Sequence, residues 1–129
     1  ESRGLGDVYK RQILCHAGAG PPPIKPNYQS MIEKLLAAYP NLYMDIAGMH
    51  IDLYDTEGNL TDIGEIILNL MKKFPGRFMV GFDMTSTEYT NVGKARNIVN
   101  LYRMYLGNLP DEIAIKVASS NAERVFSLE

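Results

Sequence analysis

The sequence has little of several features that would define its class. One cysteine, Cys15, excludes an internal disulfide and a cysteine-based zinc knuckle, and we expect this residue in the core. No apolar run approaches the roughly 20 residues that span a bilayer, so we expect no membrane segment. The formal charge is −2 and the basic residues are scattered, which excludes the basic patch of a nucleic-acid or membrane-surface binder. We expect neither nucleic acid nor a membrane as a partner, and we expect a cytoplasmic location.

The length of 129 residues fits one domain, and an apolar content of 46% is ordinary for a globular core. Residues 1–12, ESRGLGDVYKRQ, are polar and charged, are interrupted by glycine and show no clear period. They resemble adapter sequence translated in front of a reading frame, which is set aside in fold reasoning. A natural charged arm is the alternative. We therefore expect segment 1–12 to be non-native and the domain to occupy residues 13–129.

One pattern of apolar residues occurs twice along the chain. Both copies, in residues 28–39 and 63–74, have the spacing i, i+3, i+4, i+7, i+8, i+11, which forms one stripe on a helix. A proline, Pro40 or Pro75, then ends the helix because proline has no N–H to donate and restricts the residue before it. A short β-prone run follows each break. Such αβ units pack as a parallel sheet covered by helices.

The predicted order of elements is β-α-β-α-β-α-α-α. Its three strands are Ile13–His16, Leu42–Ala47 and Arg77–Phe82. Thr61 is expected to cap the second helix. The later segments are a polar loop at 85–91, a helix striped from Val92 to Leu106, a helix starting near Pro110, and a last helix opened by a Ser120–Glu123 capping box.

Two polar residues follow strands at the edge where parallel α/β proteins bind ligands. His16 ends an apolar strand and is a candidate to bind metal, or to polarise or protonate a substrate; a core histidine bonded to the backbone is the alternative. Asp83 follows the apolar run 78–82, where a carboxylate is costly to desolvate unless it is paired, hydrogen-bonded or bound to metal. A cap for the next turn is the alternative for Asp83.

Four residues near these ends carry weaker signals. Gly81 removes a side chain from its strand, which marks close approach of a ligand or of another backbone. Asp45 is expected to orient a neighbour or to point into the interior. His50 and Asp52 lie in a loop long enough to be a substrate loop, with a solvated loop as the alternative.

Four segments stand in the order seen in amidohydrolase-related enzymes. They are HAGAGP at 16–21, YPNLYMDIAG at 39–48, GRFMVGFD at 76–83 and NAERVF at 121–126. The chain from residue 13 to residue 128 thereby resembles the C-terminal part of a metal-dependent hydrolase of that superfamily. The resemblance implies an α/β fold that is a partial (β/α)₈ TIM barrel, with strands six to eight, their helices on one face only, and closing C-terminal helices.

The same resemblance implies a site and an activity. His16 corresponds to the strand-six histidine, which binds metal or positions substrate, and Asp83 to the strand-eight aspartate, which binds metal and takes a proton from water. We therefore expect the parent enzyme, of which this chain would be a fragment, to hydrolyse an amide, lactone or ester-type bond of a small-molecule substrate, with a divalent metal, zinc first, as cofactor. Whether the fragment itself is an enzyme is left open. A metal-dependent decarboxylase of the same superfamily and a non-catalytic α/β interaction domain are the alternatives. Phe82 stands where the family has serine or threonine, which makes the rim less polar.

Much of the family's pattern is missing from this chain. Three strands cannot close a barrel, and the family's strand-one His-x-His pair and strand-five histidine do not occur. A catalytic zinc takes about three protein ligands, whereas His16 and Asp83 are two. We expect a fragment that is marginally stable, self-associates through an exposed barrel face and does not hold catalytic metal tightly.

Overall fold

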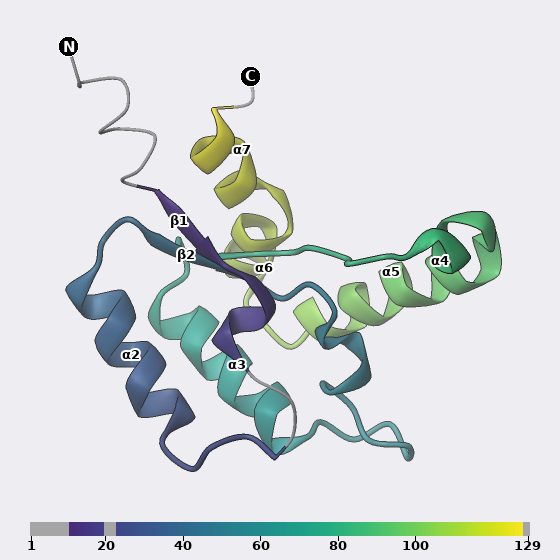
Figure 1. The fold of residues 1–129 in the computed structure, drawn as a ribbon, viewed down its shortest axis with the longest axis horizontal. Helices are drawn as coiled ribbons and strands as arrows, with labels where there is room; N and C mark the ends of the chain where they lie inside the picture. The colour runs from purple at the N-terminus through teal and green to yellow at the C-terminus, as the bar shows by residue number, and fades with distance from the viewer. Residues whose placement is uncertain (1–10, 20–22, 128–129) are drawn as a thin grey trace.

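The computed structural model describes residues 11–19 and 23–127 of the 129-residue chain. Its centre is a sheet of three parallel strands in the order β1-β2-β3 (Figure 1). The strands are β1 (Gln12–Leu14), β2 (Leu42–Asp45) and β3 (Phe78–Met79). Because the strands are parallel, with Leu14 opposite Met44 and Met44 opposite Phe78, their carboxyl ends lie at one edge.

Helices connect and flank these strands. α2 (Tyr28–Ala38) joins β1 to β2, and α3 (Asp62–Lys73) joins β2 to β3. Short turns follow the first two strands, η1 (Cys15–Gly18) and η2 (Met49–Ile51). After β3 come α4 (Ser86–Thr90), α5 (Val92–Leu106), α6 (Asp111–Ile115), the π-helical turn η3 (Lys116–Ser120) and α7 (Asn121–Phe126). Helix α4 lies where a polar loop was expected.

Both repeated apolar stripes contribute to the core, as the sequence predicts, although Met31 and Tyr39 of the first stripe are exposed. α2 and α3 lie side by side on one side of the sheet (Figure 1), and their stripes share one buried cluster with the strands. The N–H of Gly64 donates to Oγ1 of Thr61 at 3.1 Å, so the predicted cap of α3 is confirmed. The members of the cluster with no exposed surface include Ile32, Met44, Ile67, Leu70, Met71 and Phe78.

The expected partial (β/α)₈ barrel is wrong, because the three strands form an open sheet. α7 lies on the opposite side of the strands from α2 and α3, so the helices do not all cover one face (Figure 1). The cause is found at the outer edge of β3. The N–H of Val80 donates to the carbonyl of Val117 at 3.1 Å, and Nδ2 of Asn121 donates to the carbonyl of Phe78 at 2.8 Å. The C-terminal helices therefore occupy the edge that a further barrel strand would need.

All three strands are shorter than predicted. β1 ends at Leu14 because the backbone becomes left-handed at His16. β2 ends at Asp45, whose side chain turns back to accept the N–H of Ala47. β3 ends at Met79, after which the chain bonds to the C-terminal segment.

The structure also bears on three smaller predictions, which concern Cys15, the Ser120 cap and segment 1–12. Cys15 is exposed, so its expected place in the core is wrong. Ser120 makes no side-chain cap, because α7 continues directly from η3. Residues 1–10 of the expected non-native segment lie outside the described residues, and Gln12 is the first residue of β1. Over the described ranges, no helix combines the length and the apolarity needed to cross a membrane.

Candidate functional site

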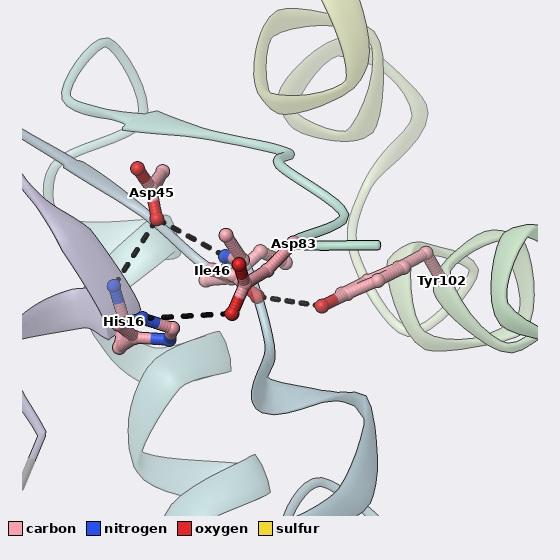
Figure 2. Close-up of polar contacts among 6 residues, drawn as sticks. His16, Asp45, Ile46, Asp83 and Tyr102 are labelled. Carbon is pink, nitrogen blue, oxygen red and sulfur yellow. Dashed lines mark hydrogen bonds and ion pairs between the residues drawn. The ribbon is translucent and has the colours of Figure 1, made fainter. Parts of the chain in front are cut away.

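His16 and Asp83 meet at the carboxyl edge of the sheet. Figure 2 shows their side chains pointing toward one another, with Nε2 of His16 3.8 Å from Oδ2 of Asp83. This distance is too long for a direct hydrogen bond, and it allows both atoms to contact one small polar group. The side chains are 47% and 59% exposed, so the pair is open to solvent. The prediction that the two residues share an edge is confirmed.

The backbone is left-handed at both residues. φ is 54° at His16, 48° at Ala17 and 50° at Asp83. For L-residues this conformation costs about 1–2 kcal/mol each, and residues held in it gather at functional sites. Among the described non-glycine residues, only Ser127 also has positive φ, and it ends the last helix. Backbone strain is therefore concentrated at the candidate site.

The left-handed turn after β1 is anchored from two sides. Within the turn, the N–H of Ala19 donates to the carbonyl of His16 at 2.8 Å. From α2, the buried hydroxyl of Tyr28 donates to the carbonyl of Ala17 at 2.5 Å. Burial raises the pKa of Tyr28 above its usual range, so this hydroxyl stays a donor. The packing of α2 thus holds His16 in its strained conformation.

Asp45 orients His16, which was one of its two expected roles. Its Oδ1 accepts the backbone N–H of His16 at 3.1 Å and that of Ala47 at 3.1 Å (Figure 2). A hydrogen bond to Asp45, together with the negative charges of Asp45 and Asp83, raises the pKa of the exposed Cys15 thiol. The neutral thiol of Cys15 is therefore favoured over the thiolate, which is the nucleophilic form.

Tyr102 supports the site from α5. Its hydroxyl donates to the carbonyl of Ile46 at 2.6 Å, and burial raises its pKa to about 12. Its ring packs edge-on against Phe82 and His50, with centroid distances of 5.6 Å and 6.3 Å. The sequence indicated only an apolar stripe here. A tyrosine in a buried stripe is itself a signal, because its hydroxyl needs a partner.

The weaker candidates have other positions. His50 and Asp52 form no hydrogen bond or ion pair with His16 or Asp83 within the described part of the chain. An ideal Cβ at Gly81 would lie 3.0 Å from the Cβ of Ala47. Gly81 therefore makes room for the neighbouring chain, which was one of the two alternatives.

The ligand types at this edge suit a divalent metal, but their number does not. Imidazole nitrogen and carboxylate oxygen both bind zinc, and a catalytic zinc takes about three protein ligands. Within residues 11–19 and 23–127, no three His, Cys, Asp or Glu side chains are grouped to hold one ion. His16 and Asp83 alone do not complete such a site.

An open groove also runs along α2, lined by Met31, Lys34 and Tyr39 among others. It includes neither His16 nor Asp83 and brings no catalytic groups together.

Comparison with known proteins gives no match to this chain. No family model, no curated protein and no solved structure matches it. The resemblance to amidohydrolase-related enzymes is therefore untested by these comparisons, and function has to be inferred from the geometry around His16 and Asp83.

Proposed function

We propose that the edge where His16 and Asp83 meet is a hydrolytic site for a small molecule with an amide, lactone or ester-type bond. The observation that carries the proposal is the convergence of an imidazole and a carboxylate from two strand ends, each on left-handed backbone. A core histidine would be buried, whereas His16 is half exposed. Thr85 and Glu88, rather than Asp83, form the capping box of the next helix. Both structural alternatives are thereby weakened.

The proposed roles follow from the geometry of the pair. Asp83 accepts a proton from the attacking water, and His16 polarises the carbonyl of the bond that breaks. With Oδ2 and Nε2 3.8 Å apart, one atom can contact the water while the other contacts the carbonyl oxygen. The proton on Asp83 then passes to the leaving nitrogen or oxygen. The carboxylate of Asp45 keeps His16 in position by accepting the backbone N–H of His16.

The metal-dependent form of this chemistry, with zinc as the cofactor, stays part of the proposal. When bound by His16 and Asp83, zinc would supply a water that ionises near neutral pH. Since the described residues provide only these two ligands, no step is assigned to the metal. Membership of the amidohydrolase superfamily and a cytoplasmic location likewise stay predictions.

The test is turnover of a probe panel with and without added zinc. 4-Nitrophenyl acetate represents esters, a five-membered lactone and an anilide represent the other bonds, and oxaloacetate reports decarboxylation. Asp83→Asn preserves shape and removes the base, so we expect a loss of about 10²–10⁴-fold. Asp52→Asn is the control, because among the described residues its carboxylate forms no ion pair with His16. Free imidazole at equal concentration gives the background rate.

The possible outcomes separate the alternatives. Loss of hydrolysis in both His16→Ala and Asp83→Asn, with the control unaffected, would support the assigned roles. Unchanged turnover in a folded Asp83→Asn variant with the same zinc content would contradict them. Carbon dioxide release from oxaloacetate, without hydrolysis of the other probes, would assign the site to a decarboxylase. A folded protein that turns over no probe would favour the interaction domain.

A further inference from the structure

The chain that leaves β2 passes directly against the His16–Asp83 pair at Gly48. A Cβ built on Gly48 would lie 2.8 Å from Cε1 of His16, and 2.9 Å from both Nδ1 of His16 and Oδ2 of Asp83. Real Cβ atoms essentially never come closer than 3.0 Å to other atoms. A side chain at this position would therefore displace the imidazole, the carboxylate or both.

Gly48 also has a φ of 70°, and this second requirement is separate from the first. The left-handed conformation favours glycine because of the local backbone alone. The lack of space for a Cβ has a different cause, namely the side chains of His16, which follows β1, and Asp83, which follows β3. A left-handed turn in another part of the chain would require positive φ without this lack of space.

The other left-handed glycines of the described chain confirm this distinction. A Cβ at Gly18 would lie 2.6 Å from Cδ2 of Leu14, the end of a flexible side chain. A Cβ at Gly58 would meet no atom within 4 Å, although its φ is 86°. Of these glycines, only Gly48 is bounded by the polar atoms of the candidate site.

We propose that Gly48 is a positioning residue, because the absence of a side chain there lets His16 and Asp83 approach each other. This inference deepens the proposed function, on which its catalytic meaning rests, by adding a residue that acts through the pair. The spacing of the pair can nevertheless be measured without any substrate. Gly58→Ala is the control for Gly48→Ala, since it also places a side chain on left-handed backbone but meets no atom within 4 Å.

The first measurement is NMR of the histidine rings. The sequence has two histidines, so His50→Ala assigns their two Cε1–H resonances. We expect Gly48→Ala to shift the resonance of His16, because a Cβ at position 48 would lie 2.8 Å from Cε1 of His16. Gly58→Ala should shift neither. Unmoved His16 resonances in a folded Gly48→Ala variant would overturn the proposal.

The second measurement is a stability cycle by urea unfolding. In a His16→Ala/Asp83→Ala background the atoms that a Cβ at position 48 would displace are gone, so Gly48→Ala should cost less there than in the wild-type background. If Gly48→Ala does not fold alone, recovery of folding in this background would support the proposal. Failure to recover, or a cost that does not change between backgrounds, would overturn it.

The third measurement is hydrolysis of 4-nitrophenyl acetate. We expect Gly48→Ala to lower kcat by about 10- to 100-fold with KM little changed, because misplaced groups lose rate at this scale. Gly58→Ala should stay near the wild-type rate. A wild-type chain that hydrolysed neither this ester nor the lactone and anilide probes would refute the proposed function, whereas the resonance of His16 and the stability cycle would still decide the role of Gly48.

Discussion

The carboxylate of Asp45, at the end of β2, accepts the backbone N–H of His16, at the end of β1, at 3.1 Å. The same Oδ1 atom accepts the N–H of Ala47 at 3.1 Å. One oxygen thus fixes the turns that follow two neighbouring strands. Asp45, which holds both turns in place, is therefore a third residue beside His16 and Asp83, whose side chains face each other.

Replacing Asp45 should loosen both turns. Asp45→Ala leaves two N–H groups without their acceptor, and because the His16 bond is exposed we expect a loss of about 1–2 kcal/mol in the free energy of unfolding. Asp45→Asn keeps an oxygen at the same place and should lose less, since only the stronger charged acceptor is gone. Urea unfolding of the two variants checks this order. Equal losses would show that the stability of the chain does not depend on an oxygen acceptor at this position.

The features predicted correctly from sequence are those with local or periodic causes. The stripes in 28–39 and 63–74 predicted two core helices because helix burial repeats along the chain. Thr61 was predicted as a cap from its place before an apolar run. The shared edge of His16 and Asp83 followed from a general rule, that carboxyl ends of parallel strands meet at one edge.

The features that were missed depend on contacts between distant residues. Whether the sheet continues beyond β3 is decided by Val117 and Asn121, and neither bond leaves a pattern in the local sequence. The barrel was inferred from the resemblance, which carries no information about how these particular strands are covered. Gly48 must lack a side chain because His16 and Asp83 occupy the space beside it. The sequence shows only a glycine after a strand, so this requirement could not be predicted from it.

Asn121 should be a major determinant of stability. It is 2% exposed, and its Nδ2 donates to the carbonyls of Pro75 and Phe78, both at 2.8 Å. Asn121→Ala leaves both carbonyls without this donor, which should lower the free energy of unfolding by about 2–4 kcal/mol. Asn121→Asp should cost more, because a carboxylate oxygen would face the two carbonyls. Denaturant unfolding measures both losses.

Asn100→Ala is the control for this prediction. Asn100 is an exposed residue of α5, so its replacement should change stability by no more than about 0.5 kcal/mol. If Asn121→Ala were as mild as this control, the edge of β3 would not depend on the asparagine side chain. The C-terminal helices would then be held at the outer edge of β3 by the Val80–Val117 hydrogen bond and by packing.

Zinc should bind weakly. The described residues offer only His16 and Asp83 at the site, short of the roughly three ligands that a catalytic zinc takes. We expect EDTA to leave the thermal midpoint unchanged, and excess zinc to raise it slightly through linkage. The rise should disappear in His16→Ala/Asp83→Asn and persist in His50→Ala. Stoichiometric zinc that survives dialysis and is lost in His16→Ala would contradict the prediction.

The alkaline stability of the chain should depend on Tyr102. Burial raises its pKa from 10.0 to about 12, so below pH 10 the phenol is neutral in both the folded and the unfolded chain. Between about pH 10 and 12 the unfolded chain loses this proton and the folded chain keeps it, so the free energy of unfolding falls as pH rises. Urea unfolding at a series of pH values gives the slope.

Tyr102→Phe separates this ionisation from the rest of the alkaline response. The variant lacks the bond to the Ile46 carbonyl, so it should be less stable at neutral pH but lose less stability above pH 10. Tyr28 and Tyr105 also have raised pKa values, but they ionise in both proteins and cancel in the difference. Tyr89→Phe is the control, since Tyr89 is 73% exposed and its slope should match the wild type. If Tyr102→Phe gave that same slope, Tyr102 would ionise as readily in the folded chain as in the unfolded one, and its buried bond to the loop after β2 would not form in solution.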